Sequence, residues 1–311
     1  MDISSARNKL TDLGFRNLQS HHDKDGKLLV QFGALPSENA TMTKSPFHSN
    51  ESDFIHFTSI ENLISILNTK RFRLYNLINM DDKSEIKWAN DQLKFKSPVN
   101  NELLEHIYCF SMCEANIIDN NQAKENLLWK LHGRDGNGIM LKLRIVNDTV
   151  CWHNYHLIKV KYNIDDAISV QYINEHDIQT KLDQKICSFI KNPIYNFEEE
   201  TRIIFENRKY YKVTVKEWER ILYPITIPDK LHKKENILYF EIPVFNFYRE
   251  HQDCFKAPSM LPQNYELPKI EITEIILGYR NSEEDESILR GKIKLIDNRI
   301  KVYRTELAKN Y

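Results

Sequence analysis

Glycine is scarce in this chain, and its scarcity argues against several kinds of nucleotide-binding protein. Only 8 of the 311 residues are glycine. Neither a GxxxxGK[ST] loop nor a GxGxxG motif opens a helix after a strand, so folds that cradle phosphates on a glycine loop are disfavoured. The one glycine cluster, GRDGNG at residues 133–138, precedes the strand-like IMLKLR, and we expect it to form a turn.

Paired cysteines are also absent. None of the 5 cysteines belongs to a CxxC pair, which favours reduced and mostly buried thiols. A zinc site can be drawn from Cys109, Cys113, Cys151 and His153, but structural zinc sites usually use tighter paired spacings. We therefore expect no metal.

The chain has no long apolar run, no export signal and almost no net charge. No run approaches roughly 18 apolar residues, so we expect no membrane-spanning helix and no membrane contact. The start, MDISSARNKLTDLGF, lacks a basic segment followed by an apolar one, which predicts a cytoplasmic protein. The net charge of −1 argues against gripping nucleic acid by bulk charge, but it leaves a local basic groove open.

Apolar residues are plentiful and their pattern predicts an α+β domain. They make up 41% of the chain, enough for a full core. Short strand-like runs alternate with helical segments from residue 53 onward, without regular βαβ spacing. The strand-like runs are FIHF, RLYN, IYCFS, IMLKLR, HLIKVKY, TRIIF, ILYFEIP and EIILGY, and the helical segments lie near 59–69, 83–95, 122–132, 175–191 and 282–293.

Composition divides the chain into an accessory part and a main domain. We expect residues 1–50 to hold a helix over 4–20, the strand-like KLLVQF and a polar linker, and residues 51–311 to form the main domain. The Lys-rich interval 207–236 is interpreted as a solvated, partly helical insertion. A surface that contacts a polyanion or a partner is the alternative.

The stretch IHFTSIENLISIL predicts a strand that passes directly into a helix. Thr58 and Glu61 fit a capping box, so we expect Thr58 to cap the helix. The apolar spacing that follows is typical of one buried helical face. His56 is less well explained, since an aromatic or β-branched residue would serve in that strand. It is either a core or edge histidine or part of a site.

A second constellation lies in NFEEETRIIF. Glu198, Glu200 and Arg202 share one face if the segment is extended. They could form a salt-bridged surface, or a negatively charged groove wall at which a carboxylate meets developing positive charge. A third candidate is the acidic NMDDKSE at residues 79–85, which also suits a simple helix start. The opposite face of the second constellation would carry Phe197, Thr201, Ile203 and Phe205.

Taken in order, these stretches resemble a large bacterial family catalogued as domain of unknown function 2971. The resemblance spans about residues 53–280 and rests on HFTSIENLISIL, MDDKSE, YCFS, LLWKLHGRDGNGIMLKL, YNFEEETRIIF and IILGY. The family pattern has Asn and Pro in the acidic turn and Tyr after the Trp. Here Asp81, Lys83 and His132 stand at those positions.

The chain also resembles ADP-ribosyltransferases. Their first motif is a strand-borne His-x-Thr followed by a helix, and some bacterial enzymes that modify nucleic acid add an Asn and an Ile-Leu. The matching positions here are His56, Thr58, Asn62, Ile66 and Leu67. These enzymes end with a catalytic Glu on a later strand, for which Glu200 matches best and Glu198 next. Tyr75, or else Tyr108, is the candidate for the aromatic that stacks on nicotinamide, and Arg202, which would order the acidic groove wall, is a further candidate NAD-binding residue.

The resemblance implies a split, mixed or antiparallel sheet with flanking helices, and NAD as a substrate. A Glu bound to the ribose 2′-hydroxyl would stabilise the oxocarbenium-like transition state of nicotinamide loss. We expect transfer of ADP-ribose to a macromolecule, nucleic acid ahead of protein, by a toxin or antiphage defence effector. An antitoxin or chaperone is a candidate partner.

Two other classes of function stay open. A non-catalytic binding or regulatory module on the same fold would use His56 and Glu200 structurally. A metal-dependent nuclease would need Asp81, Asp82, Glu198 and Glu200 to converge on one ion.

Overall fold

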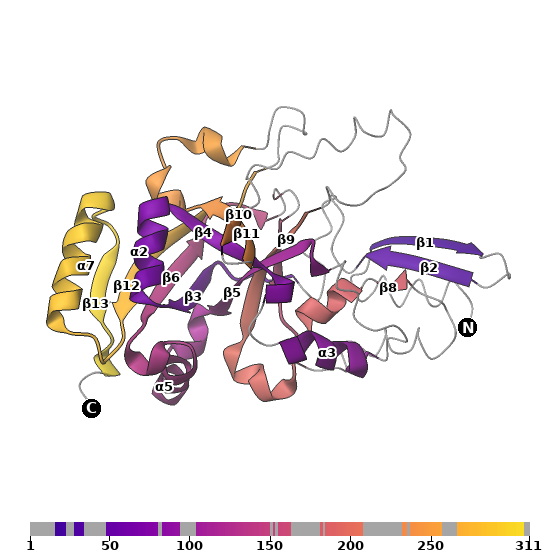
Figure 1. Ribbon diagram of the computed structural model, residues 1–311, viewed down its shortest axis with the longest axis horizontal. Coiled ribbons are helices and arrows are strands. Elements are labelled where there is room, and N and C mark those ends of the chain that lie inside the picture. The colour runs from indigo at the N-terminus through magenta and orange to yellow at the C-terminus, as the bar shows by residue number, and fades with distance from the viewer. Residues whose placement is uncertain are drawn as a thin grey trace.

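The computed structural model describes most of the expected main domain and part of the N-terminal region. The described residues are 16–22, 28–33, 48–79, 83–93, 104–149, 152, 155–162, 181–182, 184–207, 232–234, 237–256 and 266–307. Within them, one large mixed sheet is flanked by a few helices (Figure 1), which confirms the α+β prediction.

All eight expected strand-like runs of the main domain form strands of this sheet. Its order is β10-β11-β4-β5-β3-β6-β12-β13, and β9 pairs with β5 and with β7. The described strand pairs are antiparallel except β12 with β13. The bounds are β3 (Asp53–Thr58), β4 (Arg71–Asn76), β5 (Ile107–Glu114), β6 (Ile139–Ile145), β7 (Tyr155–Lys159), β9 (Glu200–Glu206), β10 (His232–Lys234), β11 (Ile237–Pro243), β12 (Ile270–Leu277) and β13 (Lys301–Arg304).

The sheet branches at β5. Strand β9 pairs with β5 from Ile107 to Cys113 and occupies one edge. On the other edge β4 pairs with Tyr108 and Cys109, while β3 pairs with Cys113 and Glu114. Among the described residues, 110–112 of β5 therefore have no strand partner on that edge. Strands β3 and β4 diverge there, and this opening positions His56.

Helices cover both faces of the sheet. Helices α2 (Ile60–Thr69) and α7 (Glu283–Ile296) lie towards one end of the molecule in Figure 1 and bury leucine and isoleucine side chains in the larger core, which also contains Phe54. Helix α5 (Gln122–Leu131) packs Leu128 and Trp129 into a second core with Ile55 and Met140. Because neighbouring strand residues point to opposite faces, Phe54 and Ile55 mark the two faces.

One further α-helix and several short 3-10 helices connect these elements. Helix α3 (Lys83–Gln92) follows the acidic turn, whose Asp81 and Asp82 lie outside the described residues. The 3-10 helices are η2 (Leu77–Asn79), η3 (Ala115–Ile118), η4 (Arg134–Gly136), η7 (Gln184–Phe189), η8 (Pro193–Glu198), η11 (Phe245–Phe247) and η12 (Gln252–Phe255). The η4 segment lies in GRDGNG, which is a turn as expected.

The N-terminal region forms part of a separate sheet. Strands β1 (Arg16–His22) and β2 (Leu28–Gly33) are antiparallel, and β8 (Lys181–Leu182) pairs with β2 in parallel. The predicted helix over 4–20 is wrong for residues 16–20, whose alternating register belongs to β1. Residues 4–15, the linker over 34–47 and most of the Lys-rich interval 207–236 lie outside the described residues.

Two further local predictions are wrong. The helix cap is Ser59, whose Oγ accepts from the backbone N of Asn62 at 3.1 Å, because Thr58 is still paired with β6 as the last residue of β3. Of the helix expected over 175–191, residues 181–182 and 184–189 instead form β8 and η7, and residues 175–180 and 183 lie outside the described residues. Residues 187–190 are all buried, a pattern that a surface helix with one apolar face does not produce.

Candidate functional site

Five charged side chains from distant parts of the chain meet at the sheet face that Ile55 marks, and we call them the ion cluster. Glu85 comes from α3, Lys191 precedes η8, Glu198 ends η8, and Glu200 and Arg202 lie on β9. The acidic motif and the Glu-x-Glu-x-Arg motif, 113 positions apart from Glu85 to Glu198, thus supply one site.

Arg202 is the fixed centre of the ion cluster. Its side chain is 0% exposed, and its Nε lies 2.7 Å from Oε1 of Glu200. Its Nη2 lies 2.5 Å from Oε1 of Glu85, and its Nη1 donates to the carbonyl of Ser188 at 2.7 Å. The rigid guanidinium therefore holds two carboxylates and one carbonyl in place.

The ammonium of Lys191 lies among all three carboxylates. Its Nζ is 2.7 Å from Glu198 Oε2, 3.0 Å from Glu200 Oε2 and 3.4 Å from Glu85 Oε2. Burial would lower the pKa of Lys191, but Glu200 and Glu85 raise it above its usual value. The ammonium is thus a permanent cation in the kind of oxygen-lined place that a metal ion would take. In the described part of the chain, no group of three or more His, Cys, Asp or Glu side chains is arranged to hold a metal.

A left-handed residue turns both glutamates of the motif toward Lys191. Glu199 has φ 42° and ψ 53°, in the left-handed region that non-glycine residues seldom occupy. Glu198 therefore ends η8 and Glu200 begins β9, so the expected single extended segment over Glu198–Arg202 is wrong. The three side chains nevertheless converge. Glu199 itself pairs with Lys124, with 2.5 Å between Oε1 and Nζ.

The electrostatics leave the ion cluster with surplus negative charge. Burial would raise the pKa of Glu200, but Arg202 and Lys191 outweigh it and hold the pKa at about 2. Three carboxylates thus face two permanent cations, an excess of one negative charge. The interpretation of this motif as an exposed salt-bridged surface is wrong, because Arg202 and both glutamates are buried.

His132 connects the ion cluster to solvent. Its Nε2 lies 3.2 Å from Oε1 of Glu198, and its side chain is 40% exposed whereas that of Glu198 is 7% exposed. It stands at the C-cap of α5, and its ring lies 6.4 Å from that of Phe57. Glu198 therefore bridges the buried Lys191 and a half-exposed imidazole.

His56 fills the opening between β3 and β4. Its Nδ1 lies 2.9 Å from the carbonyl oxygen of Ser111, one of the β5 residues without a strand partner on that edge. Since a carbonyl only accepts, Nδ1 carries the hydrogen. Burial lowers the pKa of His56 to about 4, against the opposing effect of this hydrogen bond, so the ring is neutral near pH 7. His56 therefore has a structural role, which is to hydrogen-bond a β5 carbonyl that has no strand partner on that edge within the described residues.

His56 and Glu200 lie on opposite faces of the sheet. His56 pairs with Leu141 on the face of Phe54, whereas Glu200 pairs with Cys113 on the face of Ile55. Ser111 contacts both of them: its carbonyl accepts from His56 and its side chain hydrogen-bonds Glu200.

The remaining predicted binding residues are dispersed. Tyr108 is buried in the core, edge-on to Phe240, and cannot present a free face to nicotinamide. Tyr75 is 41% exposed and lies on the same sheet face as Glu200. The buried Arg202 lies between the two along this face, so Tyr75 and Glu200 are not adjacent. Thr58 is buried at the end of β3, and Asn62 is exposed on the first turn of α2.

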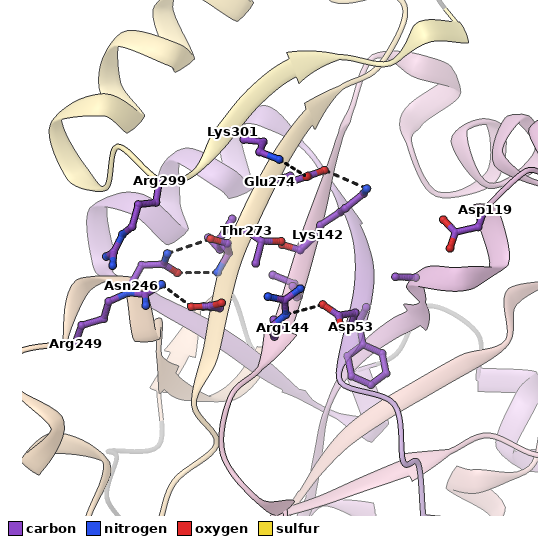
Figure 2. Close-up of a pocket in the computed structure, with 15 residues that line it drawn as sticks. Asp53, Asp119, Lys142, Arg144, Asn246, Arg249, Thr273, Glu274, Arg299 and Lys301 are labelled. Atoms are coloured by element: carbon purple, nitrogen blue, oxygen red, sulfur yellow. Dashed lines mark hydrogen bonds and ion pairs between the residues drawn. The ribbon is translucent and has the colours of Figure 1, made fainter.

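A shallow groove of about 520 Å³ lies elsewhere, over β3, β6 and β12. Figure 2 shows that its charged side chains largely neutralise one another: Arg144 pairs with Asp53 at 2.7 Å, and Lys142 with Glu274 at 3.0 Å. These side chains are paired in a more exposed place than the ion cluster, whose Arg202 and Glu200 are buried, so the groove is a weaker candidate.

Comparisons of the chain with models of protein families, with curated proteins and with solved structures find no match. Within the described residues, no helix is both long and apolar enough to cross a membrane. The geometry of the ion cluster therefore carries the functional argument. Sequence reasoning missed Glu85 and Lys191 as members, although Glu85 lies inside the acidic motif and Lys191 opens the KNPIYNFEEETRIIF segment.

Proposed function

We propose that the chain is an ADP-ribosyltransferase-like enzyme that cleaves NAD at the nicotinamide–ribose bond and transfers ADP-ribose to a macromolecule. The observation that supports this most is the surplus negative charge of the ion cluster beside a half-exposed edge at His132 and Glu198. Loss of nicotinamide generates an oxocarbenium-like charge, and preorganised carboxylates in a buried place stabilise such a charge strongly.

The geometry favours Glu198 over Glu200 as the carboxylate that meets the ribose. Both oxygens of Glu200 are held by Arg202, at 2.7 and 3.1 Å, and one of them also by Lys191. Glu198 contacts Lys191 through one oxygen and half-exposed His132 through the other. In this proposal Glu200, Glu85 and Arg202 fix Lys191, and Lys191 positions Glu198. Nucleic acid is the favoured acceptor and protein the second, as the His-x-Thr resemblance implies.

The sheet is compatible with the proposal. Its branching at β5, with β3 and β4 on the same edge, is the type of opening that a split sheet requires. The toxin or antiphage role, with an antitoxin or chaperone as partner, follows from the resemblance alone.

A second candidate is a non-catalytic binding or regulatory module. It is favoured by the placement of His56 and Glu200 on opposite faces of the sheet, where no single ligand surface joins them. In such a module the ion cluster would lock α3, η8 and β9 together.

The experiment is incubation of the purified chain with NAD labelled in the adenylate part and with cell extract. We expect label in a fraction that nuclease or protease digestion identifies as nucleic acid or protein. Glu198→Gln should abolish transfer, whereas Glu199→Gln, an adjacent glutamate directed at Lys124, should retain it. A wild type that transfers no label, releases no nicotinamide and gains no thermal stability from NAD would support the module.

A further inference from the structure

We infer that His132 is the general base that accepts the proton of the macromolecular acceptor during transfer; this rests on the proposed function. The imidazole lies at the only half-exposed contact described for Glu198, and Glu198 is anchored behind it by Lys191 at 2.7 Å. A carboxylate that holds one ring nitrogen fixes the tautomer and stabilises the imidazolium that forms.

The tautomer follows from the contact. Nε2 faces Oε1 of Glu198 at 3.2 Å and carries the hydrogen, which leaves Nδ1 as the nitrogen that can take up a proton. As an acceptor O–H or N–H attacks C1′ of the nicotinamide ribose, the C1′–N bond of NAD breaks and neutral nicotinamide leaves with the bonding electrons. The acceptor's proton moves to Nδ1, and Glu198 balances the new charge.

The end of the helix and the neighbouring groups suit a base that gains positive charge during transfer. Position 132 ends α5, where the helix dipole favours a cation. Among the described residues, Glu198 contacts the imidazole, the ion cluster lies behind Glu198, and His56, which is neutral, interacts with it electrostatically. Lys130 and Arg134 flank position 132 in the chain, and Arg134 pairs with Glu61. Lys191, Arg202 and Arg134 each contact an acidic side chain.

The test compares transfer by wild type and His132→Ala across pH, with nicotinamide release measured in parallel. Wild-type transfer should rise with pH as the base loses its proton, and His132→Ala should lose about 100-fold together with this rising limb. Added imidazole should restore transfer to His132→Ala and not to Glu198→Gln, since it replaces only the missing base.

Three results would overturn the inference. If transfer by His132→Ala still rises with pH, His132 is a structural residue. The same holds if added imidazole does not restore the transfer activity that His132→Ala has lost. Nicotinamide release by the wild type in those cases would leave the proposed function intact. Absence of nicotinamide release from the wild type would refute the proposed function and the inference together.

Discussion

Removal of the ammonium at the centre of the ion cluster should destabilise the fold strongly. In Lys191→Met three buried carboxylates would keep only Arg202 as a counter-cation. Deleting one partner of a buried ion pair costs about 3–5 kcal/mol, because the remaining charges are left uncompensated. We therefore expect the free energy of unfolding to fall by about 3 kcal/mol or more, measured by urea denaturation near neutral pH.

Lys124→Met is the matched control. Lys124 also pairs with a glutamate of the same motif, but the side chain of Glu199 is 43% exposed and Lys124 contacts only this one carboxylate of the motif, whereas Lys191 contacts three buried ones. Pairs of that kind contribute about 1 kcal/mol or less. Losing the Lys124 pair should therefore change stability much less than losing Lys191.

The loss of stability in Lys191→Met should also depend on pH. Without the ammonium, Glu200 loses one of the two cations that lower its pKa, which makes its protonation more favourable than in the wild type. The deficit of Lys191→Met should thus be largest near pH 8 and shrink toward about pH 5. A Lys191→Met loss no larger than that of Lys124→Met, or independent of pH, would refute the reasoning.

Two further predictions concern the opening in the sheet and the glycine turn. Because the pKa of His56 is lowered to about 4 from 6.5, its contribution to stability is complete above about pH 6.5 and is lost as pH falls toward 4; urea denaturation should show this slope in wild type and a smaller one in His56→Gln. An equal slope in both proteins would contradict the burial of the ring. Gly136→Ala should lower the melting temperature, since Gly136 has φ 81° and an added Cβ would lie 2.4 Å from the Tyr279 ring. Gly291→Ala in α7 is its control and should raise stability by about 0.5–1 kcal/mol, because nothing lies within 4 Å of the added carbon. A stabilising Gly136→Ala would show that this turn tolerates a side chain.

Local sequence patterns predict much of the fold. The runs around β3, β6 and β12 are apolar and rich in β-branched residues, so each was recognisable as a strand without knowledge of its partner. The helix α2 was recognisable from its apolar spacing, although its cap was placed one residue early. Two adjacent hydroxyl residues, Thr58 and Ser59, both suit a cap, and only the pairing of Thr58 with β6 decides between them.

Only part of the candidate site can be predicted from the sequence, because its residues come from distant parts of the chain. Glu198, Glu200 and Arg202 stood out by spacing, but the contact of Arg202 with Glu85 joins residues 117 positions apart. The left-handed Glu199 that turns its neighbours toward Lys191 carries no sequence signal, since glycine or asparagine is the usual choice for that conformation. The pattern likewise could not show that His56 and Glu200 occupy opposite faces, which depends on the register of β3, β5 and β9.

The most direct test of the central claim is nicotinamide release from NAD by purified wild type, Glu198→Gln and Glu199→Gln. The proposal predicts release by the wild type and by Glu199→Gln, and a loss of about 100-fold or more in Glu198→Gln, whose carboxylate faces Lys191 and His132. No release by the wild type, or equal release by the two variants, would contradict the assignment of the ion cluster as the site of NAD cleavage.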